Sequence, residues 1–212
     1  MEWHRSDLQS LSIIDQQIGE HQFAAAEYEI VRQVIQATAD YDYQKLLHFS
    51  DLALQAGAGA IANRLPIVVD TPMVMAGIMP TLLETFANPV FCAAEAVTRP
   101  QQKRSNIAWG METLLKRYPE AIAVVGESHA ALETVLHLVD TAEIAPSLII
   151  GVPSSFHPSQ QGKAKLVKSL TEHVTTHGIK GNALVAVAIV NVLTNLAWEA
   201  QGIFETSTAI KR

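Results

Sequence analysis

Cysteine, aromatic residues and charged residues are all scarce in this chain. A single cysteine, Cys92, excludes an internal disulfide and a cysteine-ligated zinc site. Aromatic residues make up 6% and charged residues 17% of the 212 positions, so the core must consist mainly of Ala, Val, Ile and Leu. That composition is typical of parallel strands packed against helices. With 49% apolar residues, the chain is too apolar for global disorder and long enough for one sizeable core.

The charge balance and the apolar runs restrict the partners and the compartment. Fifteen basic against 21 acidic residues give a net charge of −6, so no uniform nucleic-acid-binding surface is expected. The N-terminus lacks the basic-then-apolar order of a secretory signal. Residues 181–198 carry no charge, but Asn182, Asn191 and Asn195 within this stretch favour a buried helix over a membrane span. We therefore expect a cytoplasmic protein with neither a membrane nor a nucleic acid as partner.

The apolar pattern predicts N-terminal helices followed by alternating strands and helices. The first helices are expected over residues 6–18, 23–37 and 50–63. β-Branched runs then predict strands at 67–70, 90–93, 121–126, 147–152 and 173–176. Between and after them, helices are expected at 81–87, 105–117, 130–140, 160–170 and 182–199. This order predicts an α/β three-layer sandwich with a mostly parallel sheet, and the absence of a linker or repeat predicts a single domain over 1–212.

A serine lies between a predicted strand and a predicted helix, in the sequence Gly-Glu-Ser-His-Ala at 126–130. Small residues around Ser128 are compatible with the nucleophile elbow of a serine hydrolase, and Asp140 with His157 or His177 follow in the order of that triad. No glycine-rich oxyanion loop precedes them, and Ser128 is also a good N-cap for the next helix. A hydrolase is therefore kept as a remote alternative.

Three other polar patterns in the sequence are compared with known metal and anion sites. His173 and His177 are four residues apart, but the Val-Thr-Thr between them favours a strand, on which they lie too far apart to share a metal readily. No metal site is predicted. Gly162-Lys163 lacks the upstream glycine of a phosphate-binding P-loop. The basic run at 99–105 is either a solvated loop or a site for an anionic ligand, because arginine offers a two-pronged fork to carboxylates.

Six short segments share their order and spacing with one known family. They are Ser-Leu-Ser-Ile-Ile from residue 10, Val-Ile-Gln-Ala-Thr-Ala-Asp-Tyr from 34, Asp-Thr-Pro-Met-Val-Met-Ala-Gly-Ile from 70, Lys-Arg-Ser from 103, Gly-Val-Pro-Ser-Ser-Phe from 151, and Gly-Asn-Ala from 181 with Asn-Val-Leu from 191. Together they resemble the precorrin-8X (cobalt-precorrin-8) methylmutase family of cobalamin biosynthesis. The resemblance extends from residue 10 to residue 193.

The resemblance implies an isomerase that moves a methyl group between adjacent carbons of a contracted tetrapyrrole ring. Precorrin-8X or its cobalt form would become hydrogenobyrinate or cobyrinate, without a metal or an organic cofactor. It also implies a homodimer with the site near the subunit interface. A wide, apolar ring fringed with carboxylates suits a broad pocket with cationic margins. The alternative of another class is a corrinoid-binding protein that has kept the fold and lost the activity.

The resemblance also implies which residues form the site. The family's acid–base histidine falls on Gln36, whose carboxamide can hydrogen-bond to the ring but cannot donate a proton as an imidazolium does. His177 is a possible substitute as proton donor, and Arg104 becomes a clamp for a substrate carboxylate. The full set of implied substrate-binding residues is Ser10, Thr38, Asp70, Met73, Arg104, Ser105, Lys180 and Gly181.

Overall fold

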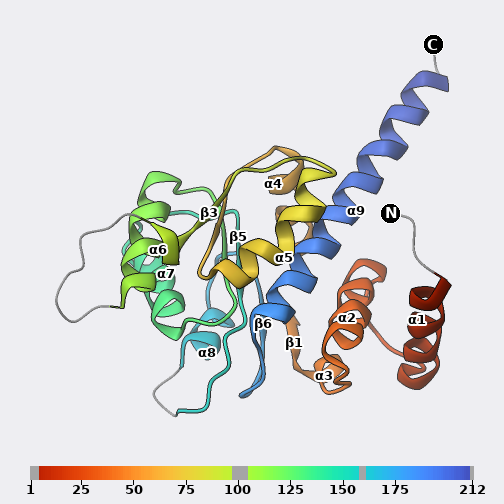
Figure 1. The fold of residues 1–212 in the computed structure, drawn as a ribbon, viewed down its shortest axis with the longest axis horizontal. Coiled ribbons are helices and arrows are strands. Elements are labelled where there is room, and N and C mark those ends of the chain that lie inside the picture. The colour runs from red at the N-terminus through yellow and green to blue at the C-terminus, as the bar shows by residue number, and fades with distance from the viewer. Residues whose placement is uncertain (1–4, 97–104, 158–160, 211–212) are drawn as a thin grey trace.

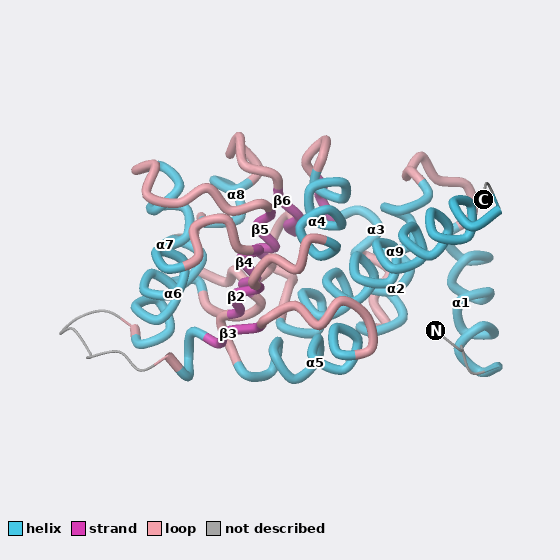
Figure 2. Tube along the Cα trace, turned by 90° about the horizontal axis from the view of Figure 1, so that it is seen from above, coloured by secondary structure: helices cyan, strands magenta, loops and turns pink. Residues whose placement is uncertain are grey.

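The computed structural model describes residues 5–96, 105–157 and 161–210, which form a six-stranded sheet between two layers of helices (Figures 1 and 2). The strand order is β1-β6-β5-β4-β2-β3, in which β1 runs antiparallel to β6 and the other neighbours are parallel. The strands are β1 (Leu47–Phe49), β2 (Ile67–Val69), β3 (Val90–Cys92), β4 (Ile122–Val125), β5 (Leu148–Gly151) and β6 (His173–Thr176). The predicted α/β fold with a mostly parallel sheet is confirmed.

The two helical layers differ in depth. One face of the sheet is covered by α6 (Asn106–Arg117), α7 (His129–Asp140) and α8 (Gly162–Leu166). The other is covered by α4 (Ala53–Ala62), α5 (Pro72–Leu83) and α9 (Ala183–Ile210), outside which lie α2 (Ala25–Thr38) and α1 (Arg5–Ile18) (Figure 2). Two short helical turns are α3 (Tyr43–Leu46) and η1 (Ala93–Glu95). The thicker layer is the one that leaves room for a cavity between helices.

Alternate side chains of the strands enter two separate apolar cores. In β2, Ile67 and Val69 pack with the layer of α2, α5 and α9, whereas Val68 packs with the layer of α6 and α7. All three side chains are fully buried. Burial on both faces explains why the parallel strands are short, continuous runs of β-branched residues.

The long helix α9 is the spine of the thicker layer. Residues Ala183–Gly202 are apolar and long enough to cross a membrane, but half of this stretch is buried inside the protein. Ile189 and Leu193 are almost fully buried, and the helix packs against α2, α4 and α5. The end of α9 projects beyond these neighbours (Figure 1). The first part of α9 is therefore a core helix, as its asparagines indicated.

The five strands predicted from the sequence are all present, and one further strand, β1, pairs with β6 at the edge of the sheet. The helix predicted at 81–87 is wrong in its position, because α5 runs from Pro72 to Leu83. Pro72 occupies the first turn, where its fixed φ favours a helix start, and Pro80 is accommodated inside the helix. The helix predicted at 160–170 is the shorter α8.

Candidate active site

A cavity of about 730 Å³ lies between α2 and α9 and contains Gln36. Gln36 is half-buried and sits near the end of α2, with Arg32 and Gln33 one turn earlier on the same wall. Across the cavity, α9 presents apolar side chains together with two asparagines. The lining residues are Ala25, Ala26, Glu29, Arg32, Gln33, Gln36, Ala37, Thr81, Leu184, Val187, Ala188, Asn191, Val192, Asn195, Leu196 and Glu199.

The charged wall of this cavity is braced from α1. The Arg32 guanidinium pairs with Glu29 at 2.7 Å and with Asp15 of α1 at 3.3 Å. Asp15 also accepts a 2.6 Å hydrogen bond from the Tyr28 hydroxyl. Burial, reinforced by the bond to Asp15, raises the pKa of Tyr28 to about 12. The two carboxylates therefore hold Arg32 in place and offset its charge at the cavity wall.

The opposite wall is formed by the close approach of α9 to α5. A Cβ on Gly77 of α5 would lie 2.5 Å from Val187 Cγ2, so only glycine permits this contact. Asn191 donates a 3.2 Å hydrogen bond to the Gly77 carbonyl oxygen. Its side-chain oxygen is buried and has no hydrogen-bond partner among the described residues. An unpaired buried acceptor in a cavity wall offers a contact to a ligand donor.

These groups orient a ligand but do not transfer protons readily. No histidine is among the residues that line the Gln36 cavity. Gln36, Gln33 and Asn191 supply amide donors and acceptors, and the guanidinium of Arg32 supplies a fixed positive charge. The apolar remainder of the lining suits the faces of a large, flat ligand.

Asp70 is placed elsewhere, at the carboxyl end of β2. There the connections diverge, since β3 lies on one side of β2 and β4 on the other. Such a crevice commonly receives the ligand of an open α/β sheet. Here the carboxylate of Asp70, fully buried, accepts hydrogen bonds from the N–H groups of Gly126, Glu127 and Ser128 at 3.1, 2.8 and 2.8 Å. These three bonds give Asp70 a structural role at this end of β2, and the substrate contact that the resemblance implies for Asp70 stays a prediction.

The structure gives no support to a hydrolase at Ser128. The Ser128 hydroxyl accepts a 3.2 Å hydrogen bond from the Ala131 N–H and so caps α7. Its backbone is ordinary, with φ −89° and ψ 106°, rather than strained. Asp140 is at the far end of α7, twelve residues after Ser128, which at 1.5 Å per residue is about 18 Å away. The helix-cap interpretation of Ser128 accounts for these contacts.

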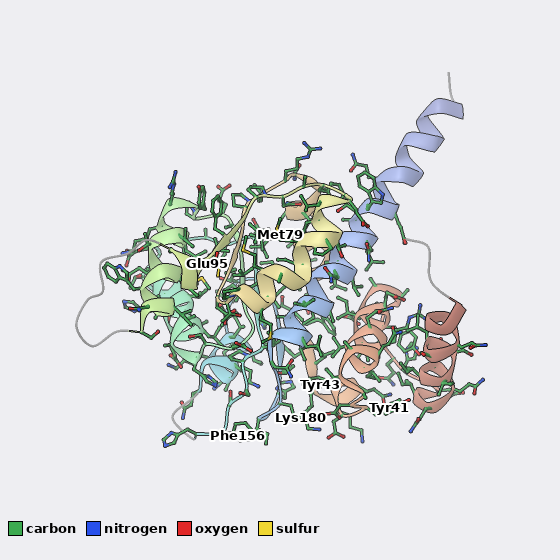
Figure 3. The ribbon with its side chains drawn as sticks, viewed as in Figure 1. Tyr41, Tyr43, Met79, Glu95, Phe156 and Lys180 are labelled. Carbon is green, nitrogen blue, oxygen red and sulfur yellow. The ribbon has the colours of Figure 1, made fainter. Side chains whose placement is uncertain are left out.

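Lys180 and Gly181 connect β6 to α9 and face the end of α2. The ammonium of Lys180, which is labelled in Figure 3, lies 2.6 Å from a carboxylate oxygen of Asp40 and 2.6 Å from one of Asp42. These bonds raise the pKa of Lys180 and, in return, lower that of Asp40. Gly181 has φ +147°, and a Cβ there would lie 2.1 Å from the Val152 carbonyl oxygen. Both residues shape the loop beside the Gln36 cavity without lining it.

The remaining predicted residues are dispersed over the chain. Thr38 donates a 2.7 Å hydrogen bond to the Val34 carbonyl oxygen, and Ser105 caps α6 by accepting from the Ala108 N–H at 3.1 Å. Met73 is 62% exposed in the first turn of α5. Ser10 is exposed on α1, His177 lines a different hollow, and Arg104 lies outside the described residues. Of the predicted residues that the structure describes, Gln36 alone is among those that line this cavity.

Sequence reasoning missed Arg32, Glu29 and Asn191 as cavity residues. Arg32 and Gln36 are four residues apart on one helix, which places them on the same face. This spacing was a usable signal, whereas the side of α9 that carries Asn191 is identified only by its packing against α5.

The fold and the cavity define a three-layer α/β protein with a broad cavity between helices, lined in part by amide side chains. The sequence profile described as precorrin-8X methylmutase matches residues 7–196. The chain is 34% identical over 205 residues to the cobalt-precorrin-8 methylmutase of Synechocystis sp., covering 90% of this chain and 94% of that one. It is 35% identical over 175 residues to the one from Methanocaldococcus jannaschii, covering 81% and 80%.

A solved structure agrees with these relatives. The precorrin-8X methyl mutase from Thermus thermophilus superposes with a TM-score of 0.83 at 28% identity, covering 93% of this chain and 99% of that chain. The chain belongs to the precorrin-8X methylmutase family. The expected class of protein, an isomerase of the corrin pathway, is thereby confirmed.

Proposed function

We propose that this protein converts precorrin-8X or cobalt-precorrin-8 into hydrogenobyrinate or cobyrinate, with the ring bound in the Gln36 cavity. The observation that carries the proposal is the position of Gln36. It lines a cavity of about 730 Å³, and by the resemblance it stands where the family has its acid–base histidine. A cavity of this size accepts a drug-sized or larger part of a ligand, and the open face accommodates the rest.

In this mechanism the protein acts mainly by positioning. The Gln36 carboxamide hydrogen-bonds to a ring nitrogen or to a side-chain group of the ring, and the apolar residues of α9 hold the ring face. Fixing the ring places the migrating methyl group next to its destination carbon. This lowers the entropic contribution to the activation free energy of the reaction. Arg32, whose charge is offset by Glu29 and Asp15, forms a polar margin of the cavity that has no net positive charge to attract a ring carboxylate.

We further propose that two copies of the chain form a homodimer that completes this site. Ser105 caps α6 in one helical layer, whereas Gln36 belongs to the other layer, so one copy does not gather the implied contacts. Ile13, Met73, Leu184 and Trp198 are between 46% and 62% exposed and offer apolar surface for a second copy. Sedimentation equilibrium tests this: a mass of twice 23.0 kDa is expected, and a monomer at micromolar concentration contradicts the dimer. The proposed compartment is the cytoplasm.

The reaction is tested by a visible-absorption time course with precorrin-8X. The unmodified protein is expected to convert the spectrum to that of hydrogenobyrinate. The Gln36→His variant restores the family's proton donor and is expected to be at least as fast. The matched control is Gln33→His, which places the same imidazole on the same helix and in the same cavity, one turn away.

The result separates the enzyme from the binding protein. Conversion by the unmodified protein establishes the isomerase and shows that histidine is dispensable at position 36. Ring binding without conversion, with activity only in Gln36→His, establishes a corrinoid-binding protein instead. Equal rates for Gln36→His and Gln33→His contradict a specific role for position 36.

A further inference from the structure

A second hollow, of about 370 Å³, lies where β5 and β6 end. Its lining residues come from the segment after β5, from α8 with the residue before it, and from the segment after β6. They are Ser155, Phe156, His157, Gln161, Lys163, Ala164, Thr176, His177, Gly178 and Ile179. None of these lining residues is acidic, although the chain has 21 Asp and Glu residues. This hollow, here called the Lys163 pocket, is therefore cationic in a protein of net negative charge.

Lys163 is buried in this pocket, with 4% of its surface exposed. Its ammonium donates to the Thr176 hydroxyl at 3.0 Å and to the Lys180 carbonyl oxygen at 2.8 Å. Both acceptors are neutral, and no ion pair of Lys163 is found within the described residues. Burial without a counter-charge lowers the pKa of Lys163 to about 8. An ammonium has three N–H donors, so one is left for a further partner.

Ser155 provides a second incomplete group in the same pocket. Its N–H donates to the Ile179 carbonyl oxygen at 2.9 Å, which fixes the segment after β5 against the segment after β6. Its hydroxyl oxygen is buried and has no hydrogen-bond partner in the described part of the chain. A buried hydroxyl without a partner is uncommon in folded proteins and calls for a specific explanation.

We propose that Lys163 and Ser155 form a carboxylate-binding site. One ammonium N–H and one hydroxyl match the two oxygens of a carboxylate, and its charge supplies the counter-ion that Lys163 lacks. His157 and His177 are exposed at the rim of the pocket. Phe156 and Ile179, 79% and 53% exposed, add apolar surface at the same rim (Phe156 is labelled in Figure 3).

The position of the pocket relates it to the Gln36 cavity. The Lys180 carbonyl oxygen accepts from Lys163, while the Lys180 ammonium binds Asp40 and Asp42, just beyond the end of α2. One residue thus links the Lys163 pocket to the helix that carries Gln36. The carboxylate belongs either to a free small acid or to the edge of a tetrapyrrole whose face lies in the Gln36 cavity. The second source rests on the proposed function.

The first experiment tests the site with acetate and succinate. Protein labelled with ¹³C at lysine Cε is titrated with either anion against sodium chloride of equal ionic strength, and the lysine resonances are followed by NMR. We expect a saturable shift of the Lys163 signal and none for Lys165, which is exposed on α8 and paired with Glu133 at 2.7 Å. The Ser155→Ala variant should bind at least five-fold more weakly.

Two variants assign the Lys163 resonance, and one result of the titration overturns the proposal. Lys163→Met removes one resonance and so identifies it, and Lys163→Arg does the same if the methionine variant does not fold. A Lys163 signal that responds no more than that of Lys165 overturns the proposal for free acids. It would then stand only if the ring carboxylate is bound, which the second experiment decides.

The second experiment titrates hydrogenobyrinate and follows its absorption. If a ring carboxylate occupies the pocket, Lys163→Met is expected to weaken ring binding about tenfold, and added succinate should compete. Unchanged ring affinity with a positive acetate titration assigns the pocket to a free acid. No response of Lys163 to either ligand overturns the site. Absence of ring binding by the unmodified protein contradicts the proposed function and leaves the acetate result to decide the site.

Discussion

Two buried charged side chains stand at the carboxyl ends of strands in the same sheet, and the protein treats them differently. Asp70, after β2, receives three backbone N–H groups and is fully buried. Lys163, beside the end of β6, has two neutral acceptors and faces a hollow. A buried charge whose hydrogen bonds are complete belongs to the scaffold, whereas one with a donor to spare indicates a binding site.

Asp70→Ala is expected to have the largest effect, because it leaves three N–H groups, one buried and two part-buried, without their acceptor. Hydrogen bonds to a charged group are worth about 1.5–3 kcal/mol each, and they are not additive, so a loss of about 3–5 kcal/mol in the free energy of unfolding is expected. Urea denaturation measures it. Asp51→Ala, at an exposed position, serves as the control and should change stability by less than about 0.5 kcal/mol. A loss below about 1 kcal/mol for Asp70→Ala would remove the distinction between the two charges.

Gly181→Ala tests the backbone that presents an acceptor to Lys163. An added Cβ would lie 2.1 Å from the Val152 carbonyl oxygen, so the loop must move. With φ at +147°, we expect a loss of about 2–3 kcal/mol in the free energy of unfolding. Gly178→Ala is the matched control: Gly178 has φ +69° but nothing within 4 Å of an added Cβ, so it should cost about 1 kcal/mol. Equal losses would mean that steric contact at Gly181 is unimportant.

Lys163→Met tests whether the buried ammonium of Lys163 makes the free energy of unfolding depend on pH. Burial lowers the pKa of Lys163 from its ordinary value of 10.5 to about 8, so the native protein releases this proton at a lower pH than the unfolded chain does. Between these values the unfolded chain binds more protons, and the free energy of unfolding rises with pH. From pH 8 to pH 10 this rise is about 2 kcal/mol, and the methionine variant should lack it.

The difference between the two proteins isolates Lys163 because the surrounding titratable groups are shared. They lie on α7, α8, β6 and the adjoining segments: His129, Glu133, His157, Lys165, His173, His177 and Lys180. Guanidinium chloride denaturation at pH 8, 9 and 10 provides the measurement. Parallel pH profiles for the two proteins would show that the pKa of Lys163 is not lowered in the native protein. Its charge would then be as well stabilised as that of Asp70.

Ser128→Ala is expected to have the smallest effect. The Ser128 N–H is one of the three donors to Asp70, but the substitution removes only the hydroxyl that caps α7. Loss of a cap costs about 1 kcal/mol, and Ser105→Ala, which removes the cap of α6, should cost a similar amount. Thermal unfolding compares the two. Labelling of Ser128 by a fluorophosphonate would contradict its assignment as a cap.

Local sequence patterns predicted the parallel strands well, because each is a β-branched run bounded by turn residues. They did not predict β1, whose three residues become a strand through pairing of Leu47 with Thr176, far away in the sequence. Nor did they give the start of α5, since Pro72 and Pro80 both resemble helix breakers out of context.

The candidate site was predictable to a lesser degree. The resemblance identified Gln36 as a site residue, and Gln36 lines the cavity between α2 and α9. The resemblance placed Asp70 among the substrate-binding residues, but whether a carboxylate faces a ligand or accepts from three backbone N–H groups depends on tertiary contacts. The glycine-lysine pair at 162–163 showed no recognisable motif, and the burial of Lys163 follows only from the packing of α8 against β6.

The position of α9 in the chain has a consequence for biosynthesis. The helix follows all the other described elements, yet α2, α4 and α5 all pack on its first half. During translation, the α6–α7 layer and the parallel strands can assemble from neighbouring segments as they leave the ribosome. The helices of the other layer can contact the strands and one another earlier, but the faces that pack on α9 stay uncovered until residues 183–199 have emerged. The Gln36 cavity therefore forms last during synthesis, when α9 packs on the helices of this layer and buries their apolar faces.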